Sequence, residues 1–165
     1  MKSTLTTVLE VDSQLEKYYR ELLANYKLDK MDVTVMEFEG EIKANDGQLS
    51  NDRIKYYISM FAYYAYALNA SLSRHTLRSD VANFYFEHAN AKAYVSHQDS
   101  EKKLTREDKS AMSKLDTENE AKINILYGRV TQAVETRIRS FNKLIETLNM
   151  LGAMNMSEAK LGGRQ

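Results

Sequence analysis

The chain contains no proline among its 165 residues, and it contains no glycine between Ser50 and Val95. Proline removes a backbone donor and breaks the helical hydrogen-bond ladder, so its absence permits very long helices. Apolar residues recur at steps of three and four through this stretch, and Ser50 is a favourable N-cap. We therefore predict one helix from residue 50 to about residue 95, about 65–70 Å long at 1.5 Å per residue.

A second long helix is predicted on the C-terminal side, and its sequence allows a break near Asp116-Thr117. The sequence T-x-x-D at Thr105 resembles a capping box, and the helical period of apolar residues continues to Leu151. Gly152 stands where a glycine commonly follows a helix. The polar residues 96–100 are expected to form a loop, so the two helices make an antiparallel hairpin.

The N-terminal third is predicted to hold a shorter amphipathic helix, from Thr6 to about Leu28. Residues 30–48 break its period, and the sequence Asn45-Asp46-Gly47 indicates a turn. We expect an irregular acidic connector there, with room for one short strand. The predicted organisation is an N-terminal helix with this connector (1–49), the long helical hairpin (50–151) and a mobile tail (152–165).

The predicted fold class is all-α: an elongated antiparallel helical hairpin with an additional N-terminal helix, which oligomerises. Apolar residues make up 43% of the chain, which is enough for a core, and no cysteine is present to form disulfides or thiolate metal sites. The N-terminus lacks the apolar run of a signal peptide, so a cytoplasmic location is expected.

A dense run of aromatic residues between Tyr56 and Tyr66 is the reason to expect oligomers. At 100° per residue these side chains surround the helix, and a helix that is apolar on most sides is buried on most sides. A three-helix monomer covers only part of each helix, so the remaining faces need another chain. The expected oligomer interface consists of Tyr56, Tyr57, Phe61, Tyr63, Tyr64 and Tyr66.

A membrane span and a stacking surface for nucleic-acid bases are two other uses that such an aromatic run can have. The thirteen residues between Lys55 and Asn69 are too few for a membrane span, which needs about 20. Stacking on nucleic-acid bases remains open, because aromatic faces bind single strands without sequence preference. Such proteins usually interleave cations with the aromatics, however, and no charge lies between Lys55 and Arg74.

No constellation of residues indicates catalysis. The three histidines, His75, His88 and His97, lack the spacing of metal ligands, and the chain has no nucleophile elbow, P-loop or dinucleotide fingerprint. We expect no enzyme activity, metal or cofactor. For the alternating acids Glu37, Glu39 and Glu41 we expect a solvated strand edge, with a divalent ion or a basic partner as the alternative.

Basic residues are distributed unevenly in a chain of zero net charge. Residues 1–49 hold six basic and ten acidic residues, whereas residues 50–165 hold seventeen and thirteen. Arg74 and Arg78 share one helical face, and Lys92 and the loop cations gather at the tip of the hairpin. In an oligomer these patches repeat as a track for an anionic polymer. Ordinary solubility charges paired with nearby acids are the alternative. The candidate residues are Arg74, Arg78, Lys92, Lys102, Lys103 and Arg106.

The chain from about residue 50 to residue 151, and the stretch from Leu104 to Leu151 in particular, resembles a known family in its layout. A long helix, a basic polar loop and a T-x-x-D-capped helix with K-S-x-M-x-x-L-D are similar to the UvsY-type recombination mediators of tailed phages. The residues that carry the resemblance are Lys109, Ser110, Met112, Leu115 and Asp116. Only Lys92 matches a DNA-contacting position of that family, and the other candidates follow from local charge.

This resemblance implies an oligomeric helical protein that binds single-stranded DNA. It also implies partners, a RecA-like recombinase that the protein helps to load and a single-strand-binding protein that coats the strand. The expected setting is the cytoplasm of a phage-infected bacterial cell, with no membrane contact. The alternative function is a phage protein-interaction module, a virion or scaffold component or an inhibitor of a host defence system, that acts by helical packing without nucleic acid.

Overall fold

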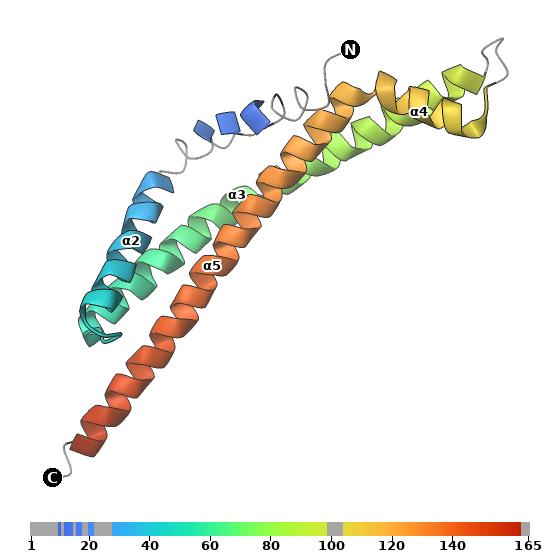
Figure 1. Ribbon diagram of the computed structural model, residues 1–165. Helices are drawn as coiled ribbons and strands as arrows, with labels where there is room; N and C mark the ends of the chain where they lie inside the picture. The colour runs from blue at the N-terminus through green and yellow to red at the C-terminus, as the bar shows by residue number, and fades with distance from the viewer. Residues whose placement is uncertain are drawn as a thin grey trace. The chain divides into compact units, whose positions relative to one another are not determined.

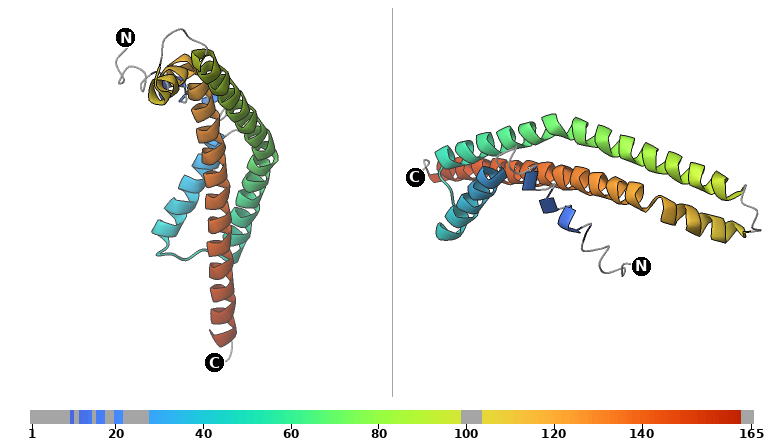
Figure 2. Two further views of the ribbon diagram at one scale, coloured as in Figure 1. Left: turned by 90° about the vertical axis from the view of Figure 1, so that its right-hand side faces the viewer. Right: turned by 90° about the horizontal axis from the view of Figure 1, so that it is seen from above.

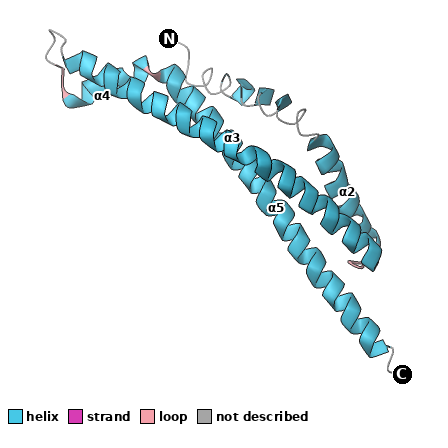
Figure 3. Cartoon of the chain, turned by 180° about the vertical axis from the view of Figure 1, so that it is seen from behind, coloured by secondary structure: helices cyan, strands magenta, loops and turns pink. Residues whose placement is uncertain are grey.

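The computed structural model describes residues 28–98 and 104–162, and scattered positions between 10 and 21. Figure 1 shows the helices, and Figure 3 shows that the described residues outside them form short loops, with no strand. The helices with described bounds are α2 (Leu28–Ala44), α3 (Asn51–Gln98), α4 (Arg106–Asp116) and α5 (Glu118–Gly162).

The long helices α3 and α5 pack antiparallel as a hairpin, which confirms the predicted all-α hairpin (Figure 2). The described positions between residues 10 and 21 are helical, in agreement with the predicted N-terminal helix. Most of the apolar positions expected on that helix lie outside the described residues. So does the predicted loop from residue 99 onwards, including Lys102 and Lys103.

The chain divides into two compact units, and α3 and α5 contribute to both. Unit 1 contains residues 72–133 together with the described positions up to residue 17. Unit 2 contains the described residues from 20 to 71 and from 134 to 162, which include the whole of α2. The two units differ in what they bury, so each is considered by itself.

Helix α2 in unit 2 corrects the expectation of an irregular connector over residues 30–48. Met31, Thr34 and Phe38, at spacings of three and four, are buried along one side of α2. Val33 lies outside this side of the helix and is exposed. The middle residue of this buried side is a threonine, which interrupts the apolar pattern that would indicate a helix in the sequence. The helix ends before the predicted turn, where Asp46 and Gly47 adopt positive φ.

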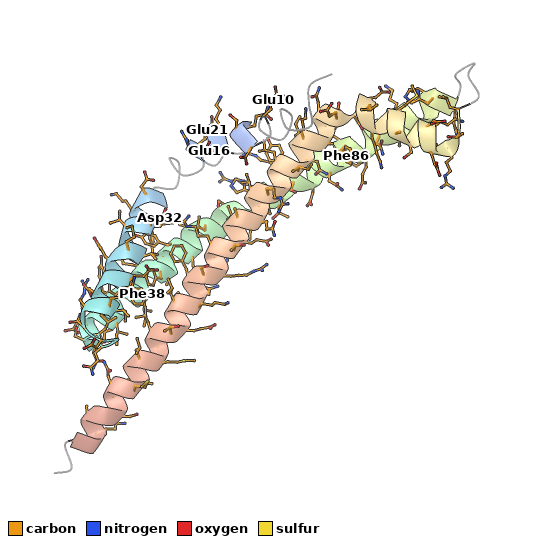
Figure 4. The ribbon with its side chains drawn as sticks, in the orientation of Figure 1. Glu10, Glu16, Glu21, Asp32, Phe38 and Phe86 are labelled. Atoms are coloured by element: carbon orange, nitrogen blue, oxygen red, sulfur yellow. The ribbon has the colours of Figure 1, made fainter. Side chains whose placement is uncertain are left out.

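Aromatic rings form the centre of unit 2 (Figure 4). The ring of Phe38 lies edge-on to Tyr57 and Phe61, with centroids 5.2 and 5.6 Å apart. Phe61 in turn stacks on Phe141 of α5, at 5.7 Å and 25°. Tyr64 also contacts Phe141, at 5.7 Å. Three helices are therefore joined through one cluster of rings.

Polar groups around this cluster are paired. The Thr34 hydroxyl donates its only hydrogen to the Lys30 carbonyl, so the Tyr64 hydroxyl must donate to Thr34, over 3.0 Å. Arg137 of α5 forms an ion pair with Asp32 of α2. Such bonds satisfy buried hydroxyls that would otherwise cost stability.

The buried aromatics correct half of the predicted oligomer interface. Tyr57 and Phe61 are completely buried and Tyr64 nearly so, and their ring partners belong to the same chain. A second chain cannot contact them while this core is intact. Tyr56, Tyr63 and Tyr66 are exposed. The aromatic side chains therefore surround the helix as predicted, but only these three can contact another chain.

Three predicted helix boundaries are confirmed. The Ser50 hydroxyl accepts a hydrogen bond from the Arg53 amide at the start of α3. Thr105 and Asp108 form a reciprocal capping box at the start of α4. A break near residue 117 was expected, and Thr117 is a turn residue between α4 and α5 whose hydroxyl donates to the Ser113 carbonyl.

Two predicted boundaries were wrong. Helix α3 continues through residues 96–98, where a loop was expected, and Ser96 donates its hydroxyl hydrogen to the Ala93 carbonyl. Helix α5 continues through Gly152 to residue 162, where a mobile tail was expected. Gly152 lies against Ile54 of α3, and three residues later the Asn155 side chain donates to the Leu49 carbonyl. These contacts extend the helix past a residue that otherwise favours ending it.

Unit 1 buries little apolar surface. Its buried described residues are mostly small or polar: His75, Ala82, Ser113, Thr117 and Val130. Several large apolar side chains of the same unit are exposed on α3, among them Leu77, Phe84 and Tyr85. Unit 2 therefore holds most of the apolar core.

We predict that Phe61→Ala lowers the free energy of unfolding by about 3–5 kcal/mol, because it removes the ring shared by three helices. Urea denaturation followed by circular dichroism measures this loss. Met36→Ala on the exposed face of α2 is the matched control and should change stability by less than about 0.5 kcal/mol. An equal effect of the two substitutions would contradict this core.

His75 should make stability depend on pH. Burial lowers the pKa of its imidazole below the usual 6.5, and the positive charge of Arg78 lowers it further. The unfolded chain thus binds a proton at pH values where the folded chain does not. Stability should fall as the pH drops through 6.5 towards the folded pKa.

Urea denaturation at pH 7.5 and 5.5 measures this loss, which should be smaller in His75→Gln than in the natural sequence. The same pH dependence in both proteins would show that His75 does not contribute to it.

Candidate nucleic-acid interface

A stripe of exposed side chains follows α3 through unit 1. Its members alternate at steps of four and three residues, which places them on one side of a helix. All six are exposed. We call this set the α3 stripe: Arg74, Arg78, Val81, Tyr85, His88 and Lys92.

Aromatic rings are available to solvent on and beside the stripe. Phe84 and Tyr85 are 65% and 64% exposed, although large aromatic side chains usually bury most of their surface. The Phe84 ring stacks on His88 with centroids 6.1 Å apart and planes 10° apart, and it lies edge-on to Tyr85. The three rings form a small exposed aromatic surface between Arg78 and Lys92.

An apolar groove of about 480 Å³ runs beside the stripe, between α3 and α5 of the same unit. Val81 and Tyr85 line it from α3, and Ile123 and Tyr127 line it from α5. Arg78 and Glu120 also contribute to its walls. The groove can therefore accept a flat or apolar group next to a cation.

Acidic side chains are absent from the six described positions of the stripe. Asp80 and Glu87 are the acids nearest in sequence, and their positions lie to one side of it on the helical wheel. Glu87 accepts a hydrogen bond from the side-chain amide of Asn83. The side-chain oxygen of Asn83 accepts one from Asn124 of α5. The stripe itself therefore carries no carboxylate, and Glu120 of α5 lines the same groove as Arg78.

The structure brings together three of the predicted DNA-binding residues: Arg74, Arg78 and Lys92 share the stripe. Arg106 is exposed as the first residue of α4. Lys102 and Lys103 lie outside the described residues.

Charged residues of α5 and α2 do not join the stripe. Arg139 of α5 pairs with Glu135 one turn away, in addition to the pair between Arg137 and Asp32. Residues 37, 39 and 41 lie on a helix, so these acids do not form the common face that a strand would give them.

One member of that acidic group forms a specific pair. The Arg53 guanidinium binds the Glu41 carboxylate through two nitrogens and donates a further hydrogen bond to the Tyr57 hydroxyl over 2.8 Å. The hydrogen bond from Arg53 holds the pKa of Glu41 below its usual value. This pair fixes the start of α3 against the end of α2 and occupies the Glu41 carboxylate.

Among the described residues, no group of three or more histidine, aspartate or glutamate side chains could hold a metal ion. None of the described helices is long and apolar enough to cross a membrane. The sequence interpretation overlooked Val81, Phe84, Tyr85 and His88 as site residues. Their signal in the sequence is the spacing of three and four residues that relates them to Arg74 and Arg78.

Comparisons with known proteins give no identity, since no family model, curated protein or solved structure matches the chain.

Tetranitromethane should nitrate Tyr85 readily and leave Tyr57 unmodified in the folded protein, because only the first ring is exposed to solvent. Peptide mass spectrometry of the digested protein distinguishes the two sites. Denaturation in urea before the reaction is the control and should make both rings reactive. Rapid nitration of Tyr57 under native conditions would contradict the aromatic core of unit 2.

Proposed function

We propose that the protein binds single-stranded DNA through the α3 stripe and acts as an oligomeric recombination mediator without enzymatic activity. The observation that carries the proposal is a group of exposed aromatic rings, Phe84 and Tyr85, that lies between exposed cations along one side of α3. Proteins that bind single strands combine a basic track for phosphates with aromatic platforms for bases. The stripe supplies both, whereas the tyrosine run lacks the cations.

The chemistry of each residue follows from its position. Arg74 and Lys92 lie at the two ends of the stripe and are suited to phosphates, whose contacts position a strand without reading its sequence. Phe84 and Tyr85 lie between these cations and are suited to base stacking. Because every base has an apolar face, such binding is tolerant of sequence.

The mediator role rests on the resemblance of about residues 50–151 to the UvsY-type family. In that role the protein assists the loading of a RecA-like recombinase onto a strand covered by single-strand-binding protein. An ATPase assay of such a recombinase on a coated strand tests this step. The protein should shorten the lag before hydrolysis, and an unchanged lag would limit the proposal to DNA binding.

The DNA-binding experiment is fluorescence anisotropy of a labelled oligo-dT, titrated at several salt concentrations. Affinity should fall steeply with salt, because each phosphate contact adds about 0.7 to the slope of log affinity against log salt. Replacing Arg74 and Lys92 by alanine should lower that slope by about 1.4. Lys143→Ala, an exposed site in unit 2, is the matched control and should leave it unchanged.

Phe84→Ala tests the stacking contribution separately from charge. Loss of one stacked base costs about 1–3 kcal/mol, so affinity should fall roughly 5- to 150-fold at constant salt slope. A normal affinity in this variant would remove the ring from the site. If neither variant nor salt affects binding, the α3 stripe is not a nucleic-acid interface.

The apolar groove favours a second candidate, the protein-interaction module. A groove lined by Val81, Tyr85, Ile123 and Tyr127 also suits the apolar face of a partner helix. Such a protein would be a virion or scaffold component or an inhibitor of a host defence system. It would fail to bind oligo-dT even at low salt, which separates the two candidates in the same titration.

A further inference from the structure

A second exposed face of α3 lies in unit 2 and differs in character from the stripe. Its residues follow one another at steps of three and four, the spacing of a heptad seam. Tyr63 and Tyr66 at its centre are 64% and 75% exposed. All five positions are exposed. We call this set the tyrosine seam: Tyr56, Ser59, Tyr63, Tyr66 and Ala70.

Charge is absent from this part of the helix. No charged residue occurs between Lys55 and Arg74, so the seam offers no ion pair by which a charged partner could be selected. The Ser59 hydroxyl already donates to the Lys55 carbonyl over 2.9 Å, so covering Ser59 leaves no hydroxyl donor unpaired. The seam is thus suited to burial against another uncharged helix.

The amount of surface is consistent with a helix pair. A tyrosine side chain buries roughly 150–250 Å² when fully covered, and the seam carries three that are now 41–75% exposed. Two copies of the seam would together bury several hundred Å² through tyrosine alone. Neighbouring small residues such as Ala62 and Ala67 add to this area and allow close approach of the helices.

We propose that the partner of the tyrosine seam is the same seam of a second copy of this chain, packed antiparallel. In that arrangement Tyr63 of one copy lies opposite Tyr66 of the other, and Ser59 lies opposite Ala70. Between residues 59 and 70, large residues therefore meet large ones and small residues meet small ones about the two-fold axis of an isologous interface, and Tyr56 lies beyond this central part. Opposed helix dipoles also favour the antiparallel over the parallel pair.

This inference extends the proposed function, which needs more than one copy, and it names the surface that joins them. It excludes Tyr57, Phe61 and Tyr64 from that surface, because the core of unit 2 already covers them. It adds Ser59 and Ala70, which no aromatic pattern would identify. The nucleic-acid residues lie elsewhere on α3, so assembly and DNA binding can be measured independently.

Light scattering after gel filtration at tens of micromolar protein tests the assembly. The natural chain should have the mass of two copies or a multiple of it, and Tyr63→Glu with Tyr66→Glu should reduce the mass by at least half. Met36→Glu, at an equally exposed position on α2, is the matched control and should leave it unchanged. A monomeric natural chain, or an unchanged mass in the seam variant, would overturn the proposal.

Engineered cysteines test the register even if the seam variant is poorly folded. The natural chain has no cysteine, so any disulfide must come from the introduced residues. Under mild oxidation the double variant Ser59→Cys with Ala70→Cys should form covalent dimers, and neither single variant should. Dimers from a single variant would overturn the antiparallel arrangement, and no dimers at all would overturn the interface.

The two proposals fail in distinguishable ways. If only the seam is wrong, the chain binds oligo-dT but is monomeric or joined through another surface. If only the DNA site is wrong, the seam variant changes mass while oligo-dT remains unbound at every salt concentration. The Arg74→Ala and Lys92→Ala variant links the measurements, because it should weaken DNA binding and keep the mass of the natural chain.

Discussion

The contact between Phe61 and Phe141 determines much of the architecture of unit 2. It joins α3 to α5, and the edge-on contact of Phe38 with Phe61 brings α2 to the same point. Three helices therefore share one buried ring. Because aromatic rings bury more area than any aliphatic residue, one such cluster can compensate for the small and polar interior of unit 1.

Differences in burial along α3 give its faces separate uses. Around residues 56–66, one side forms the core with α2 and α5, and the opposite side presents uncharged tyrosines to solvent. In residues 74–92, the exposed side carries cations and aromatic rings instead. A single proline-free helix can therefore provide both an uncharged surface and a charged surface, and the two remain separate because they occupy different lengths of α3.

The sequence was sufficient for the hairpin, the capping box at Thr105 and the break at Thr117, since these depend on local periodicity and side-chain capping. It failed at α2, where Thr34 occupies a core position through its bond to Tyr64, and at Gly152, where packing against Ile54 overrides a helix-ending preference. The cations of the site were predicted from charge spacing. Its aromatic members were missed because exposure of Phe84 and Tyr85 is a property of tertiary packing.

Helix α4 buries little apolar surface, although the Asp116 carboxylate at its end contacts the His97 imidazole of α3 over 2.8 Å. It has its own capping box and ends at the Thr117 turn, and its one buried residue is Ser113, while Leu115 is 71% exposed. Segments with few buried apolar contacts open without global unfolding. The amides of residues 110–116 should therefore exchange with solvent through local opening, long before those in the ring-packed part of α3, and this turn of the chain can change conformation while the rest stays folded.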